Sequence, residues 1–145
     1  MSIQKATILE LESLTELFDL YRVFYEQTSD PDRAREFLRE RLTNGESVVF
    51  MAFEEGNPVG FVQLYPSFSS VSMVRSWVLN DLYVKESARK KGFGEELLKG
   101  AITFGRETGA KGILLETGKD NVNAQKLYEK IGFVRESNYF YHFTI

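Results

Sequence analysis

Cysteine is absent from the 145-residue sequence, and histidine occurs only once. The absence of cysteine excludes disulfides, thiolate metal ligands and a cysteine nucleophile, and we expect no bound metal. No apolar run approaches the roughly 20 residues that a membrane-spanning helix needs. The N-terminal residues 1–6 also lack the apolar core of a signal peptide. We therefore expect a cytoplasmic protein with no membrane partner.

An excess of positive charge is also missing. The 18 Lys and Arg residues face 21 Asp and Glu residues, which gives a net charge of −3 at pH 7. Nucleic acid is therefore not an expected partner. Hydrophobic residues make up 43% and aromatic residues 14% of the chain, as in folded globular proteins and unlike disordered ones. The length and the single, well-spread apolar pattern predict one domain over residues 1–145.

Apolar periodicity and turn residues predict a strand, two helices, three strands, a helix, a strand, a helix and two closing strands. The strands are expected at 3–9, 47–53, 59–65, 73–84, 113–117, 133–136 and 139–145, and the helices at 11–25, 31–42, 95–109 and 121–131. Short connections predict antiparallel pairing in the first half, and the strand-helix-strand unit at 73–117 predicts a parallel pair. The fold class is α/β, with a mixed, mostly antiparallel sheet, a central parallel pair and helices on both faces.

The segment 82–94 predicts a site for a diphosphate. An apolar strand leads into the basic residues 89–91, then Gly92 and Gly94, then a helix. A helix start offers unpaired backbone N–H groups and the positive end of the dipole, and glycines let a ligand approach that backbone closely. A Walker A loop and a dinucleotide fingerprint are both disfavoured, because Glu95 follows Gly94 and Leu97 stands where a small residue is needed.

Two motifs in this order carry a family resemblance. The pattern Arg89-x-x-Gly92-x-Gly94 resembles the acyl-CoA pyrophosphate loop of the GNAT (GCN5-related N-acetyltransferase) family. One helix and one strand later, the segment 121–133 resembles that family's Asn-x-x-Ala-x-x-Leu-Tyr-x-x-x-Gly-Phe motif. The order of elements agrees along the whole chain, and residues 77–84 look somewhat like the polyamine, thialysine and histone-type branch.

The resemblance implies acetyl-CoA as co-substrate and a homodimer, and it implies roles by position. The backbone of Leu82, Tyr83 and Val84 would face the pantetheine arm, with Asn121 and Ala124 flanking it. The pyrophosphate would lie in a cradle formed by Arg89, Lys90, Lys91, Gly92, Phe93, Gly94 and Glu95. Tyr128 would lie near the sulfur.

The chemistry of N-acetyl transfer makes Tyr128 a candidate acid. A neutral amine must attack the thioester, and the oxyanion of the tetrahedral intermediate must be stabilised. The departing thiolate then takes a proton. Since the reference pKa is near 8.5 for a thiol and near 10 for tyrosine, proton transfer from tyrosine is uphill by only about 2 kcal/mol. The alternative is that Tyr128 packs under Phe133 as an ordinary helix residue.

The general base is less well defined by the sequence. A primary amine has a pKa near 10, so its proton must be removed at neutral pH. Asp81 lies in the middle of the long strand and is a candidate for binding the amine or taking its proton; the alternative is a structural carboxylate. Asn80 stands where small-amine members of the family often carry glutamate. This difference weakens the assignment of a general base to this position by resemblance. Asn80 would then hold a water or orient the amine. Glu26 is a candidate for binding a cationic substrate; the alternative is that Glu26 is an ordinary solvated glutamate in a loop.

The sequence thus predicts an acetyl-CoA-dependent N-acetyltransferase whose acceptor is a small primary amine, such as a polyamine or an amino acid. A protein lysine or N-terminal amine is an alternative acceptor. A non-catalytic CoA-binding regulatory domain and a nucleotide-binding module are the alternatives from other classes. Specificity is expected from the first two helices and from the loop at 66–72.

Overall fold

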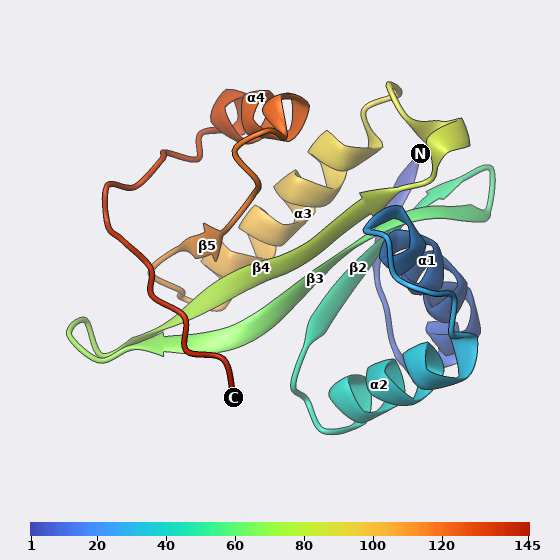
Figure 1. Ribbon diagram of the computed structural model, residues 1–145, viewed down its shortest axis with the longest axis horizontal. Helices are drawn as coiled ribbons and strands as arrows, with labels where there is room; N and C mark the ends of the chain where they lie inside the picture. The colour runs from blue at the N-terminus through green and yellow to red at the C-terminus, as the bar shows by residue number, and fades with distance from the viewer.

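The computed structural model describes residues 1–145, which form a five-stranded sheet and four helices (Figure 1). The strands are β1 (Ser2–Lys5), β2 (Val48–Glu54), β3 (Asn57–Ser69), β4 (Val74–Val84) and β5 (Ile113–Leu115). The helices are α1 (Leu11–Phe24), α2 (Pro31–Thr43), α3 (Phe93–Glu107) and α4 (Val122–Ile131), with 3₁₀ turns η1 (Ile8–Glu10) and η2 (Glu86–Ala88). None of the helices is long and apolar enough to cross a membrane.

The strands follow one another across the sheet in chain order. The pairs from β1 to β4 are antiparallel, and β4 pairs with β5 in parallel through the α3 crossover. This arrangement confirms the predicted α/β class, the mostly antiparallel sheet and the helices on both faces. The parallel pair, however, lies at one edge of the sheet and not at its centre, because no strand pairs with the outer edge of β5.

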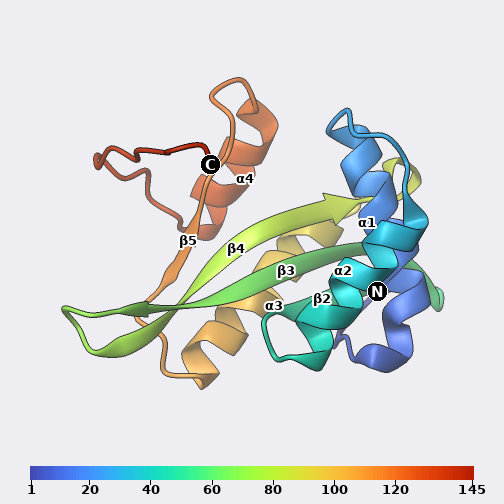
Figure 2. The same cartoon turned by 60° about the horizontal axis from the view of Figure 1, so that its bottom comes forward.

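Helices cover both faces of the sheet, and each face has its own apolar core. On one face, α1 and α2 bury Leu14, Leu17 and Leu38 against side chains of β2 and β3 (Figures 1 and 2). On the other face, α3 buries Leu97 and Leu98 against strands that include β3 and β4. Because side chains alternate along a strand, successive residues of β3 supply both cores.

The helix starts follow local signals. Pro31 is the first residue of α2, and the Asp30 carboxylate accepts a hydrogen bond of 3.2 Å from the backbone N–H of Arg33, as predicted. The predicted first strand at 3–9 is too long, because Thr7 and Glu10 form a reciprocal capping box that starts the turn before α1.

β3 is longer than predicted, and the expected loop at 66–72 is mostly strand. Residues 66–69 pair with 74–77 of β4, so only a short turn at 70–73 remains. A neighbouring strand supplies hydrogen-bond partners here, and this pairing outweighs the local preference of a serine-rich segment for a loop.

The two closing strands predicted at 133–136 and 139–145 are wrong. Residues 133–145 contain no strand, and after α4 the chain returns over the face of the sheet that carries α1 and α2 (Figures 1 and 2). Tyr139 and Tyr141 are 87% and 96% exposed. β5 has only three residues, so it offers the C-terminal segment little strand edge to pair with.

Candidate active site

β5 is the edge strand of the sheet, and it separates from β4 after a short run of pairing. Their pairing ends at Leu79 and Leu115. At the same point Gln63 of β3 pairs with Asp81 whereas the next residue pairs with Leu79, so Asn80 is an extra residue in β4. Beyond Asn80, the edge of β4 that faces β5 has no strand partner. The three residues predicted to face a pantetheine arm, 82–84, lie on this open edge.

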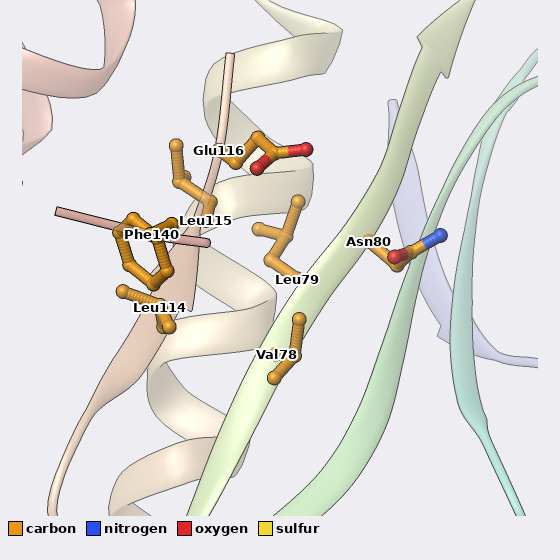
Figure 3. Close-up of a pocket in the computed structure, with 7 residues that line it drawn as sticks. All are labelled: Val78, Leu79, Asn80, Leu114, Leu115, Glu116 and Phe140. Atoms are coloured by element: carbon orange, nitrogen blue, oxygen red, sulfur yellow. The ribbon is translucent and has the colours of Figure 1, made fainter. Parts of the chain in front are cut away.

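A cavity of about 240 Å³ marks the point of separation. Asn80 and Glu116 lie on opposite sides of it, and Phe140 of the C-terminal segment lies next to Leu114 and Leu115 (Figure 3). The remaining residues of its lining are Val78 and Leu79. The C-terminal segment therefore contributes one wall of the cavity, a role that the sequence did not indicate.

The start of α3 has the features of an anion site. Gly92 precedes the helix with φ of 90°, and no side chain caps the first N–H groups. A Cβ at Gly92 would meet no atom closer than Met1 Cε at 4.0 Å, so the approach to this backbone is open. Phe93 is buried and anchors the turn, whereas a Cβ on Gly94 would lie 3.4 Å from Leu127. These features fit a diphosphate bound by backbone N–H groups.

Two of the basic side chains near this helix start have other partners. Nε of Arg89 donates a hydrogen bond of 2.9 Å to the carbonyl of Val84, and its guanidinium lies 4.9 Å from the ring centre of Phe24. Lys91 forms an ion pair of 3.1 Å with Glu54. Lys90 adopts φ of 65° in the turn. The backbone of α3 is thus the better-placed anion donor, with the positive charges at its margin.

α4 carries the second motif. Asn121 precedes the helix without making a side-chain cap, and Ala124 is partly buried in its first turns. The ring of Tyr128 packs edge-on against Phe133 at 5.9 Å, so the packing that the alternative predicted is present. The Tyr128 hydroxyl makes no hydrogen bond within the protein. Burial, with a smaller contribution from Tyr25, raises the pKa of Tyr128, so the hydroxyl is protonated at neutral pH and is a weaker acid than a free tyrosine.

Asp81 lies in a polar cluster inside the sheet. It is only 5% exposed and forms no ion pair. Its Oδ2 accepts a hydrogen bond of 2.7 Å from Nε2 of Gln63, and its Oδ1 accepts one of 3.1 Å from Nδ2 of Asn80. Burial raises the pKa of Tyr21, and the Asp81 charge raises it further. The same two causes, in the same order, raise the pKa of Tyr65 to about 12. The carboxylate thus faces two protonated tyrosines and no cation.

Sequence reasoning missed Gln63 in this cluster. The available signal was a glutamine in the middle of an apolar strand, where a polar residue is unexpected without a partner. Its partner lies 18 residues away, and the pairing depends on the strand register.

Glu26 is not part of the same cluster. It follows α1 with φ of 63°, is exposed, and makes no side-chain hydrogen bond or ion pair. A positive φ in a non-glycine residue carries backbone strain. The structure gives this residue no partner, and its predicted role in binding a cationic substrate stays a prediction.

A sheet that opens beside an uncapped helix start is the arrangement that the sequence resemblance predicts for an acyl-CoA-dependent acyltransferase. The chain belongs to the acetyltransferase (GNAT) family, whose model matches residues 12–133.

Individual proteins agree with this assignment. A Bacillus subtilis protein described as "Uncharacterized N-acetyltransferase YhfO" is 43% identical over 142 residues, which are 98% of this chain and 95% of that protein. The crystal structure of a protein described as "a probable acetyltransferase" is 46% identical, with a TM-score of 0.92 over 100% of this chain and 97% of the other. An aminoglycoside N-acetyltransferase in complex with CoA shares the fold at 19% identity, with a TM-score of 0.82 over 99% of this chain and 93% of the other.

Proposed function

We propose that residues 1–145 act as a single domain that transfers an acetyl group from acetyl-CoA to a primary amine of a small molecule. The observation that carries the choice of acceptor is the buried Asp81 carboxylate, which has no cationic partner in the protein. Removing a charge from water costs free energy unless another charge or hydrogen bonds compensate. Two amide donors compensate in part, and a substrate ammonium group would supply the missing positive charge.

The aromatic side chains around Asp81 support the same acceptor. Tyr21 of α1 lies 5.1 Å from the ring of Tyr25 and 6.1 Å from that of Tyr83. Aromatic rings attract cations through their faces, and they enclose the carbon chain of an amine without adding charge. A small organic amine therefore suits this part of the molecule.

Acetyl-CoA fits the residues on the other side of the opening. The uncapped N–H groups at the start of α3 would bind the diphosphate, and the open edge of β4 at 82–84 would bind the pantetheine amides. Asn121 and Ala124 of α4 would flank the pantetheine arm. The aminoglycoside N-acetyltransferase that holds CoA has the same fold, which supports acetyl-CoA as the co-substrate.

The reaction would proceed by direct attack. The amine nitrogen bonds to the thioester carbonyl carbon and forms a tetrahedral intermediate, whose collapse breaks the carbon–sulfur bond. The ammonium group first loses one proton to Asp81 or to a water held by Asn80, and the nitrogen loses its second proton to solvent as the intermediate collapses. The Tyr128 hydroxyl donates a proton to the departing thiolate, and solvent returns it.

A panel of amines tests the proposal. Purified protein is incubated with acetyl-CoA and polyamines, amino acids, aminoglycosides, or peptides with a free lysine or N-terminus, and free CoA is measured. We expect turnover on one class of small amine, with the acetylated product identified by mass. Turnover on peptides alone would show that the acceptor is a protein. Acetyl-CoA binding without turnover on any amine would instead indicate a non-catalytic CoA-binding domain.

The homodimer and the cytoplasmic location expected from the sequence stay predictions. Light scattering of the purified protein measures the first, and fractionation of the producing cells measures the second.

A further inference from the structure

Gln63 is fully buried in the middle of β3, between the equally buried apolar residues Val62 and Leu64. The strand register places it directly opposite Asp81, where the extra residue Asn80 shifts the pairing of the two strands. A bulge at such a point turns the side chains of its strand in a new direction. The fold therefore holds this amide at the position where the extra residue interrupts the register of β3 and β4.

The amide of Gln63 has only one orientation that suits its surroundings. A carboxylate only accepts hydrogen bonds, so the donor Nε2 must face Asp81, and it lies 2.7 Å from Oδ2. The carbonyl Oε1 then points away, where it is buried and has no hydrogen-bond partner. An unpaired buried acceptor reduces stability, so this arrangement points to a role other than holding the fold together.

Gln63 is also the firmer of the two amide donors to Asp81, and the Tyr21 hydroxyl on α1 is a further donor to the same carboxylate. Asn80 makes the longer bond, of 3.1 Å, and its side chain is exposed to solvent. Gln63 makes the shorter bond and is enclosed on all sides. Gln63 therefore holds one oxygen of the carboxylate, Oδ2, from inside the sheet.

The other groups around Asp81 leave the carboxylate open to a ligand cation. Tyr21 faces it from α1 and Tyr65 from β3, and both keep their protons at neutral pH. Arg41 of α2 acts on Tyr65, but its guanidinium is paired with two glutamates, at 2.9 and 3.1 Å. No Lys, Arg or His forms an ion pair with Asp81.

We propose that Gln63 is a positioning residue, which holds the Asp81 carboxylate in the orientation that receives the ammonium group of the acceptor amine. The inference rests on the proposed function and adds a residue to the amine side of the same site. Gln63 acts through Asp81 and does not touch acetyl-CoA. Its replacement therefore changes the kinetics of the amine and leaves the affinity for acetyl-CoA unchanged.

The first test is Gln63→Met, which keeps the size of the side chain and removes both polar atoms. We expect kcat/KM for the best amine to fall by about 10- to 100-fold, the range for a group displaced by about 1 Å. The fall should appear mainly as a higher KM for the amine. Acetyl-CoA affinity, measured by calorimetry, should match the wild type.

The second test is Gln63→Glu, which gives a pH dependence that a purely structural role would not produce. Two adjacent carboxyl groups share one proton at lower pH, and the protonated carboxyl group of the variant then donates to Asp81 in place of the amide. At higher pH both groups ionise and repel each other. The ratio of the variant's kcat/KM to that of the wild type should therefore be largest at the acidic end of the assay range and should fall as pH rises.

Thr15→Val is the matched control. The Thr15 hydroxyl is also buried without a partner, but it lies in α1 within the core between the helices and the sheet. Its removal should leave the amine KM and the pH profile unchanged.

The outcomes separate the two proposals. An active wild type, with unchanged amine kinetics and pH profile in both Gln63 variants, overturns the positioning role alone. The positioning role is also overturned if kcat/KM falls in both variants by the same factor at every pH and the fall matches a loss of folded protein. If Gln63→Met does not fold, the pH dependence of Gln63→Glu decides the question. A wild type that binds acetyl-CoA but acetylates no amine overturns the proposed function, and the positioning role with it.

Discussion

The Oε2 atom of Glu95, in the first turn of α3, accepts a hydrogen bond of 3.2 Å from Nζ of Lys130, near the end of α4. The bond joins the helix start that offers the anion site to the helix that carries Tyr128. The hydrogen bond from Lys130 is the main reason why the pKa of Glu95 lies below its ordinary value, with Lys99 adding a smaller effect. Glu95 thus links the two motifs that define the family, besides lying in the predicted pyrophosphate cradle.

Replacing Lys130 with Met should cause a small, pH-dependent loss of stability. The pKa of Glu95 is lower in the folded protein than in the unfolded chain, so its contribution is present above the ordinary glutamate pKa and is lost as pH falls through the lowered value. The melting temperature of Lys130→Met should lie slightly below that of the wild type at neutral pH and low salt, and should converge with it in acid. The pair is exposed, so added salt should also reduce the difference.

Lys126→Met, on the same helix but without an ion pair, is the control and should melt like the wild type at every pH. A Lys130→Met deficit of constant size across pH and salt would show that lost packing, not the bond to Glu95, causes the effect.

Tyr128→Phe should lower turnover while leaving acetyl-CoA binding nearly intact. The change removes one hydroxyl and keeps the ring that packs against Phe133. Proton donation to the thiolate matters mainly in the transition state, so its loss affects kcat more than ground-state binding. General-acid catalysis contributes about 100- to 10,000-fold to a rate. Because a thiolate already leaves readily, we expect turnover to fall by only about 10- to 100-fold. The affinity for acetyl-CoA should change by less than about 1 kcal/mol.

Steady-state kinetics on the best amine, with calorimetry for acetyl-CoA, measure both quantities. Tyr141→Phe is the matched control, because Tyr141 is 96% exposed in the C-terminal segment. Wild-type turnover in Tyr128→Phe would show that the tyrosine is a packing residue and that the thiolate leaves unassisted.

Gly92→Ala should weaken acetyl-CoA binding through the backbone of the loop. Gly92 has φ of 90°, a conformation that costs an L-residue about 1–2 kcal/mol. A strained or shifted turn would misalign at least one N–H donor, so we expect the affinity to fall by about tenfold.

Gly45→Ala separates strain from binding. Gly45 has φ of 64°, and a Cβ there meets nothing within 4 Å, so it carries a similar backbone cost far from the site. Both variants should lose stability to a similar extent in denaturant, but only Gly92→Ala should lose acetyl-CoA affinity. Equal affinities in the two variants would remove Gly92 from the binding site.

Asp81→Asn should reduce turnover more than acetyl-CoA affinity. The change removes the buried charge while keeping a group that can still accept a hydrogen bond from Gln63. We expect a higher KM for the amine and an altered pH–rate profile. The pKa of Tyr65 should also fall from about 12, because the Asp81 charge is one of its causes, and a spectrophotometric titration of the tyrosines measures this change.

Asp32→Asn, whose side chain is 97% exposed, is the control for loss of one negative charge. A folded Asp81→Asn protein with an unchanged pH–rate profile would show that Asp81 is structural.

Prediction from sequence was most accurate where the signal is local. Asp30 and Pro31 start α2, and Gly132 ends α4 with φ of 123°, because capping depends on a few consecutive residues. It was less accurate where a strand needs a partner from elsewhere. Residues 66–69 were predicted as a loop but form a strand, because β4 lies alongside them. Residues 133–145 were predicted as strands but form none. Both predictions considered only the residues of the segment itself.

By itself, the sequence determined the order of the helices and strands from β1 to α4, the glycine loop before α3, the motif on α4 and hence the family. These features depend on spacing along the chain, which a sequence shows directly. Only the tertiary structure decided that the extra residue Asn80 opens the sheet beside β5, that Gln63 meets Asp81, and that Phe140 comes to lie over β5. These contacts join residues far apart in the chain, and strand register and packing, which no local pattern encodes, bring them together.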